Sequence, residues 1–132
     1  MADSGEQQVS FNSERLAALL EELRAAHPEV IADAVATRGG LLLASATGSS
    51  AEAEKLAAFG AGLLKAADAP ADALAGGPAE EAYARGVAGH VIVIAAGPGA
   101  VLTAVAGPSA SLHLLVPALR QVTAHLGQHL TE

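Results

Sequence analysis

The stretch VIVIAAGPGAVLTAVAG, Val91–Gly107, decides how the rest of the sequence is interpreted. It lies within a run from Gly86 to Leu119 that contains no Lys, Arg, Asp or Glu. A membrane-spanning helix needs about 20 consecutive apolar residues, and Gly97-Pro98-Gly99 interrupts this run, so a span is disfavoured. A phosphate-binding loop is also disfavoured, because these glycines lead into a strand-like segment and no lysine follows them.

What remains is a β-hairpin with strands at about His90–Ala96 and Ala100–Ala106. Both strands are apolar at nearly every position instead of alternating between apolar and polar residues. Continuous apolarity indicates that both faces of the sheet are covered. We therefore expect helices on both sides of a mainly antiparallel sheet.

The N-terminal part predicts a disordered tail followed by an amphipathic helix. Residues 1–10, MADSGEQQVS, are polar and acidic, which is the reverse of a signal peptide. In the next segment, FNSERLAALLEELRAAHP, leucines recur at helical spacing, with Asn12 or Ser13 as the N-cap. Pro28 ends this pattern. We expect a single domain over residues 11–132.

A hairpin and a second helix are expected next. Arg38-Gly39-Gly40 separates two apolar runs, which predict strands at about Ile31–Thr37 and Leu41–Ser45. Ser49 and Glu52 have the spacing of a capping box, and the apolar residues of SSAEAEKLAAFGAGLLKAAD form one helical stripe.

The last third predicts a loop, a strand, the central hairpin and a closing helix. Asp68–Pro78 is rich in Ala, Gly and Pro and is expected to be the one long internal loop. Glu80–Gly86 predicts a third strand. In SASLHLLVPALRQVTAHLGQHL the apolar spacing is helical, and Pro117 indicates a kink or a start later than Ser109. The predicted fold is α/β (α+β), with the order α-β-β-α-β-β-β-α and a five-stranded sheet.

The composition limits the class of function. The chain has 132 residues, of which 52% are hydrophobic, enough for the core of one domain. It has no cysteine, which excludes a disulfide framework, a thiolate nucleophile and a cysteine zinc site. The net charge of −7 disfavours binding to nucleic acid or to anionic lipid. We expect a cytoplasmic protein without a cofactor.

No group of side chains predicts an enzyme. His125 and His129 are four residues apart, a spacing that can place two imidazoles on one metal ion. The alternative is that they are exposed near a helix C-terminus, where positive charge is favoured. His90 has no companion acid for catalysis, and Ser109 and Ser111 lack the G-x-S-x-G pattern of a nucleophile. We therefore expect no catalytic, cofactor-binding or metal site.

The order of elements resembles the Roadblock/dynein light-chain family, a branch of the longin-like small α/β domains. The resemblance is carried by RGGLLLAS, then SSAEAEKLAAFGAGLL, then GHVIVIAAGPGAVLTAVAG before the closing helix, and it covers about Phe11–Leu130. The chain departs from the family in its Ala-rich strand before Gly86 and in Pro117. The resemblance implies a non-enzymatic homodimer or heterodimer, and bacterial members regulate or scaffold small Ras-like GTPases.

We therefore predict a dimeric interaction module that regulates or scaffolds a small Ras-like GTPase. The alternatives are a small-molecule-binding sensor domain and a structural subunit of a larger assembly. A sensor needs a cavity with several convergent polar groups, and Val91–Ala106 offers only Thr103.

Two elements are candidates for the dimer or partner interface. Glu80–Gly86 is expected to be an edge strand that pairs with a second copy, with Tyr83 as its one large side chain. On the second helix, Phe59 falls about 90° from the stripe that faces the sheet, so it either folds over the core rim or anchors a partner. Gly60 and Gly62 are costly inside a helix, and close approach of another backbone would explain both of them. The predicted interface residues are Phe59, Gly62, Lys55, Glu52, Tyr83, Ala82 and Ala84.

Overall fold

The computed structural model of the chain describes residues 2–46 and 49–130, with side chains described from residue 13 to residue 127 within these ranges. Its elements are α1 (Ala2–Ala26), β1 (Val30–Thr37), β2 (Leu42–Ala44), α2 (Ser50–Ala75), β3 (Glu81–Gly86), β4 (Gly89–Ala96), β5 (Ala100–Ala106) and α3 (Leu112–Leu130). This is the order of helices and strands that the sequence predicts.

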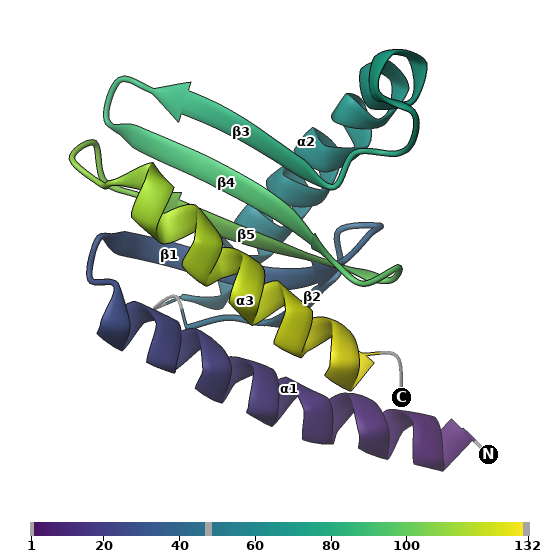
Figure 1. The fold of residues 1–132 in the computed structure, drawn as a ribbon. Coiled ribbons are helices and arrows are strands. Elements are labelled where there is room, and N and C mark those ends of the chain that lie inside the picture. Colours follow the sequence, from purple (N-terminus) through teal and green to yellow (C-terminus); the bar gives the residue numbers. More distant parts are fainter. Residues whose placement is uncertain (1, 47–48, 131–132) are drawn as a thin grey trace.

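The strands of the described residues form one antiparallel sheet in the order β2-β1-β5-β4-β3, as Figure 1 shows. β4 and β5 pair from His90 opposite Ala106 to Ala96 opposite Ala100, so the charge-free run forms the predicted hairpin. β5 also pairs with β1 and is the central strand. The predicted α+β class and five-stranded sheet are confirmed, and β2 and β3 are the two edges.

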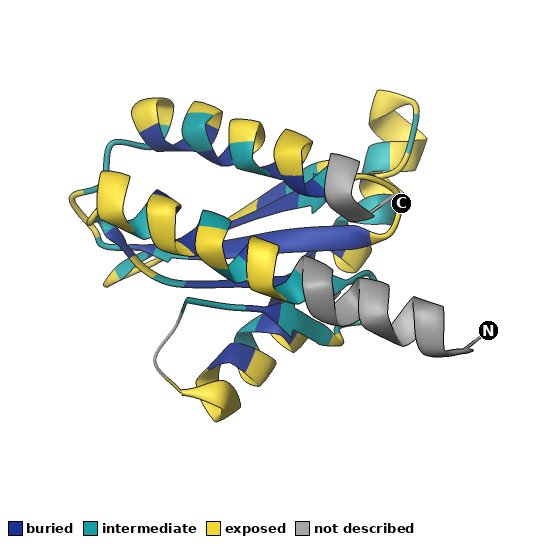
Figure 2. Cartoon of the chain, turned by 90° about the horizontal axis from the view of Figure 1, so that it is seen from below, coloured by how far each residue is buried: buried dark blue, intermediate teal, exposed yellow. Residues whose placement is uncertain are grey.

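Helices cover both faces of this sheet. α1 and α3 lie on one face and α2 crosses the other (Figure 1). Figure 2 shows that each helix turns its buried side toward the strands and its exposed side outward. Leucines of α1 and α3 pack with Ile92 and Leu102 in the larger core, whereas Leu64 of α2 packs with Val93 and Val101 on the opposite face. The strands are apolar on both sides because both sides are covered.

The predicted first hairpin is also present. Its strands, β1 and β2, are joined by a turn in which Gly40 has a φ of 96°, a conformation that glycine adopts without steric cost. The Gly40 amide donates a hydrogen bond to the Thr37 carbonyl at 2.9 Å. Gly97-Pro98-Gly99 forms the corresponding turn between β4 and β5, which explains why those glycines precede a strand.

α2 approaches the centre of the sheet very closely at Gly60. A Cβ atom placed on Gly60 would lie 1.7 Å from Oγ1 of Thr103, so no larger residue fits without movement. The other buried residues of α2 are mostly small as well: Ala53, Ala57, Ala61 and Leu64. Gly62 differs, because a Cβ there would meet nothing within 4 Å. The close approach of α2 to β5 within the domain explains why residue 60 is glycine. It does not explain why residue 62 is glycine.

The beginning of α2 matches the sequence and its end does not. The Glu52 amide donates to Oγ of Ser49 at 3.2 Å, which confirms the predicted N-cap. The prediction of a long loop at Asp68–Pro78 is wrong, because α2 continues to Ala75 with Pro70 inside it. Six of the ten residues from 66 to 75 are alanine, the strongest helix former, and this outweighs one proline. Gly76, with a φ of 91°, ends the helix.

The other two helices differ from prediction at their starts. α1 begins at Ala2, so the helix cap predicted at Asn12 or Ser13 is wrong. Met1 and the side chains of residues 2–12 lie outside the described part, and the division into a tail and a domain stays a prediction. α3 begins at Leu112, later than Ser109 as Pro117 indicated, and Pro117 lies inside it. Pro117 is the sixth residue of α3, beyond the four amides that have no partner in a helix, so it removes one backbone hydrogen bond, the one to the His113 carbonyl.

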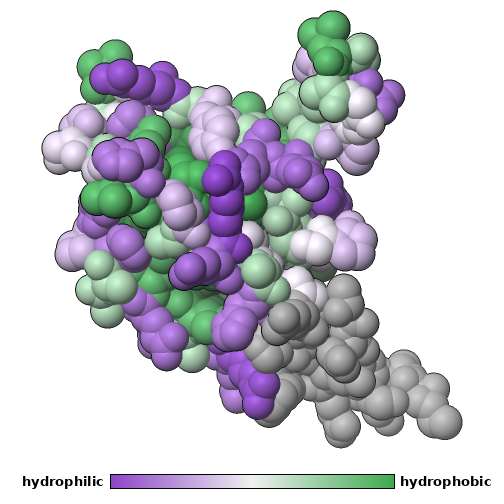
Figure 3. Space-filling model, in the orientation of Figure 1, coloured by the Kyte–Doolittle hydropathy of each residue, from purple (hydrophilic) through white to green (hydrophobic). Residues whose placement is uncertain are grey.

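The surface combines charged side chains with isolated apolar ones. Figure 3 shows hydrophilic side chains surrounding smaller hydrophobic areas on the face that carries α1 and α3. No helix within residues 2–46 and 49–130 is long and apolar enough to cross a membrane. Among the side chains that the structure describes, the large hydrophobic ones that are exposed are Ile31, Leu41, Phe59, Leu74, Tyr83, Val87 and Leu114.

Candidate interaction surface

The outer side of α2 carries four of the predicted interface residues. Phe59 is 74% exposed, so it does not fold over the rim of the core within this chain. Glu52, Lys55 and Gly62 are exposed too, and helical geometry places all three on the same side as Phe59. The result is an apolar anchor beside a glycine, with one acidic and one basic side chain toward the N-terminus of α2.

The three predicted residues of β3 divide between two faces of the sheet. Ala82 and Ala84 point toward the α2 side and Tyr83 toward the α3 side, because side chains alternate along a strand. Ala82 is buried and belongs to the cluster that includes Leu64 of α2, whereas Ala84 and Tyr83 are exposed. Ala82 therefore packs inside the domain, and Tyr83 lies on the opposite face of the sheet from Phe59.

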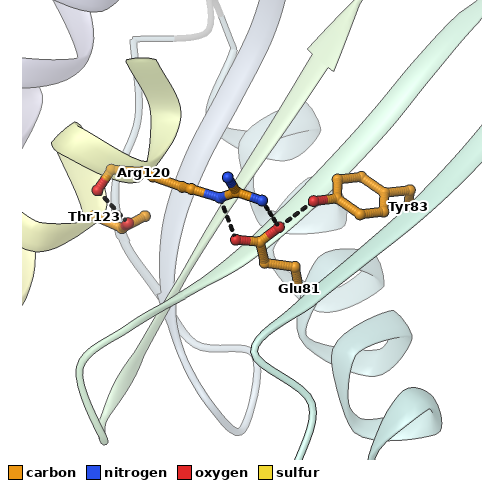
Figure 4. Close-up of polar contacts among 4 residues, drawn as sticks. All are labelled: Glu81, Tyr83, Arg120 and Thr123. Carbon is orange, nitrogen blue, oxygen red and sulfur yellow. Dashed lines mark hydrogen bonds and ion pairs between the residues drawn. The ribbon is translucent and has the colours of Figure 1, made fainter. Parts of the chain in front are cut away.

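Tyr83 belongs to a polar cluster that joins the edge strand to α3, shown in Figure 4. Arg120 donates from Nε to Oε2 of Glu81 at 2.6 Å and from Nη2 to Oε1 at 2.9 Å. The Tyr83 hydroxyl donates to the same carboxylate. Thr123 Oγ1 donates to the Arg120 carbonyl at 2.9 Å, one turn back along α3. Two parallel hydrogen bonds fix the relative orientation of the guanidinium and the carboxylate.

The contacts in this cluster shift the pKa values of Glu81 and Tyr83. The hydrogen bond from Arg120 lowers the pKa of Glu81, and burial together with the adjacent Glu81 carboxylate raises the pKa of Tyr83. The phenol is thus held neutral beside an ionised carboxylate. Sequence reasoning missed the Glu81–Arg120 pair, because the two residues are 39 positions apart and nothing local links them.

A second polar cluster, also missed, lies around the buried Asp33 of β1. Oδ1 of Asp33 accepts the Ala46 amide at 2.8 Å, and Ser45 Oγ donates to the Asp33 carbonyl at 2.7 Å. Arg24 of α1 donates from Nη1 to the Ala46 carbonyl at 2.6 Å. Burial raises the pKa of Asp33, although the Ala46 amide and the Arg24 charge act in the opposite direction. The cluster holds the chain after β2 against α1 and β1, a structural role.

Of the predicted pair His125 and His129, the structure describes the side chain of His125 alone. His125 lines a surface hollow of about 370 Å³ between α1 and α3, together with His27 and Glu22. The side chain of His129 lies outside the described residues. Among the described residues, no group of three or more His, Cys, Asp or Glu side chains has an arrangement that could hold a metal ion.

Comparison with solved structures shows which known folds this arrangement resembles. The fold is similar to that of a Roadblock/LC7 domain from Streptomyces avermitilis, with a TM-score of 0.83, 19% sequence identity, and coverage of 88% of this chain and 98% of that one. It is also similar to the gliding protein MglB from Thermus thermophilus, with a TM-score of 0.79, 24% identity, and coverage of 89% and 90%. For MglB from Myxococcus xanthus the TM-score is 0.75, the identity 17%, and the coverage 86% and 93%.

Sequence comparison identifies the family of the chain. A search of curated proteins finds no match to this chain. Residues 16–106 match the family model of the Roadblock/LC7 domain, and they run from α1 to the end of β5. Because this match covers more than half of the sequence, the chain belongs to the Roadblock/LC7 domain family.

Proposed function

We propose that this chain is a non-catalytic, homodimeric module that regulates or scaffolds a small Ras-like GTPase. Its membership of the Roadblock/LC7 family supports the general role, since the resemblance implies such regulators among bacterial members. The proposal includes a cytoplasmic location and assigns no catalytic residue to the chain.

The open edge of β3 supports self-association. β3 lies at the end of the sheet, and its six residues pair in regular register with β4 from Glu81 to Gly86. A regular edge strand offers unpaired amide and carbonyl groups to another strand. Pairing of β3 with β3 of a second copy would satisfy these groups around a two-fold axis. We place Tyr83 and Ala84 at this seam.

The exposure of Phe59 is the observation that carries the proposal. A large apolar side chain that is 74% exposed, beside a glycine with open space around it, suits the anchor of an interface. Gly62 allows the backbone of a second helix to approach, which explains a glycine that the domain itself does not require. Lys55 and Glu52 would form the polar rim.

The substitution Phe59→Asp tests this assignment. We expect a folded domain by circular dichroism, a shift from two copies to one in sedimentation, and GTPase affinity weakened by about 30-fold, as for loss of a typical hot spot. Candidate GTPases are those encoded near the gene. Leu114→Asp is the matched control, since Leu114 of α3 is 64% exposed on the opposite face of the sheet.

Two outcomes would contradict the proposal. One is that Phe59→Asp keeps both self-association and partner affinity unchanged. The other is that Leu114→Asp weakens self-association and partner affinity as strongly as Phe59→Asp does. The weakening would then arise from the added negative charge and not from the loss of Phe59. Leu64→Asp, at a side chain only 2% exposed, provides the unfolded reference for the dichroism measurement. Leu63 is only half-buried and would be a less severe site for this reference.

A further inference from the structure

A hollow of about 350 Å³ lies between the turn that joins β1 to β2 and the middle of α2. Arg38 and Gly39 line it from the turn, and Lys65 and Asp68 line it from the helix. Aliphatic side chains of α2 and β5 line the remainder. It is separate from the exposed side of α2 that carries Phe59, because Lys65 lies about 120° around the helix from Phe59.

The charge in this hollow is opposite to that of the chain. The whole chain has a net charge of −7 and only seven Lys and Arg residues, of which two are here. Within the described residues, neither Arg38 nor Lys65 forms an ion pair with a carboxylate. Asp68 is the carboxylate that lines the hollow, and its Oδ1 already accepts the Ala79 amide at 2.9 Å. The hollow therefore has an excess of positive charge.

Arg38 also has an unused donor. Its Nη2 donates to the Gly97 carbonyl at 3.2 Å, but its Nε is buried and has no acceptor among the described residues. A buried donor without an acceptor is unfavourable, and a charged donor more so. Because Nε itself is buried, an oxyanion in the hollow would have to bind the guanidinium through its terminal nitrogens.

Arg38 borders a second hollow, of about 420 Å³, which has a different balance of charge. Glu80 and Glu81 line that hollow, and Arg120 there is already paired with Glu81. The carboxylates cancel the cations in it. An anion is therefore directed to the first hollow, where Arg38 and Lys65 face one carboxylate.

We propose that the hollow between the β1–β2 turn and α2 binds an oxyanion, a carboxylate or phosphate group, through Arg38 and Lys65. The planar guanidinium suits a two-oxygen contact and the lysine adds a mobile point charge. The oxyanion is either a small free anion or the acidic side chain of a partner protein. This site does not depend on the proposed role of Phe59.

The first experiment is a titration of the full ¹⁵N-labelled chain with inorganic phosphate, followed by NMR at constant ionic strength because salt screens such contacts. We expect saturable shifts at the amides of Gly39, Gly40 and Lys65. Arg38→Gln and Lys65→Gln should each weaken phosphate binding about tenfold, the effect of losing one charged hydrogen bond. Arg85→Gln, at an exposed cation of β3, is the matched control and should bind phosphate normally.

A second titration with N-acetylglutamate distinguishes the sources of the anion. Binding of phosphate alone supports a free phosphate-type ligand, and binding of both probes supports the acidic side chain of a partner. The proposal is overturned if neither probe shifts these amides. It is equally overturned if Arg85→Gln weakens binding as much as Arg38→Gln does, because the attraction would then be unspecific. Dichroism spectra of the three variants exclude unfolding as the cause.

Discussion

Replacing Gly60 by alanine is expected to destabilise the protein, although alanine is the better helix former by about 1 kcal/mol. The new Cβ would lie 1.7 Å from Oγ1 and 2.8 Å from Cβ of Thr103, whereas ordinary contacts begin at 3.4 Å. Thr103 lies on the central strand, which pairs on both sides and cannot retreat without disturbing β1 and β4. α2 must therefore move outward from the sheet.

The expected size follows from two opposing effects. Adding a methyl group to a full core costs about 1–3 kcal/mol, and a contact this short places Gly60→Ala at the upper end. The gain in helix propensity offsets about 1 kcal/mol of this. We expect a net loss of about 2 kcal/mol in the free energy of unfolding.

Urea unfolding followed by circular dichroism measures this loss. All samples need one protein concentration, because self-association makes apparent stability depend on concentration. Gly62→Ala is the matched control on the same helix, and at a protein concentration low enough to keep the chain monomeric it should gain up to about 1 kcal/mol, because its Cβ meets nothing within the domain. Thr103→Ala added to Gly60→Ala should recover part of the loss, since it removes the nearest atom. A Gly60→Ala variant as stable as the parent would refute the close approach of α2.

Two further predictions concern the polar clusters. Asp33→Asn keeps an acceptor for the Ala46 amide and removes a buried charge, so at neutral pH it should be at least as stable as wild type, while Asp33→Ala should lose about 1–3 kcal/mol in urea unfolding. Because the pKa of Asp33 is raised, the free energy of unfolding of wild type should increase relative to that of Asp33→Asn as pH falls through that pKa. Arg120→Gln should lower the melting temperature at neutral pH. That difference should disappear as pH falls through the lowered pKa of Glu81, and a difference that persists in acid would argue against the ion pair.

The sheet is predictable because its signals are local. β5 occupies the predicted Ala100–Ala106, and β4 begins one residue before the predicted His90. Continuous apolarity between two turn signals leaves few alternatives for these segments. The cap of α2 at Ser49 is equally local, because the hydroxyl and the amide it binds are three residues apart.

Features that depend on distant parts of the chain were not predictable. Asp68–Pro78 has the glycine and proline content of a loop, but the alanines up to Ala75 keep it helical, and the Asp68 side chain accepts the Ala79 amide 11 positions further along the chain. Asp33 lies in an otherwise apolar strand, and its partner Ala46 is 13 positions away. Helical geometry predicted that Phe59 lies off the buried stripe but did not decide between the core rim and an exposed position, and in the structure Phe59 is 74% exposed.

The two edges of the sheet are unequal, and this limits how large an assembly the sheet can build. β3 offers six residues in unbroken register, whereas β2 has three residues and pairs with β1 through an irregularity at Val35/Ala36. Two copies joined through β3 expose only β2 at both ends of the combined sheet. A strand so short gives little backbone pairing to a third copy, so growth stops after one addition. In the dimer that we propose, the short β2 edge would therefore disfavour growth of the sheet into a fibre.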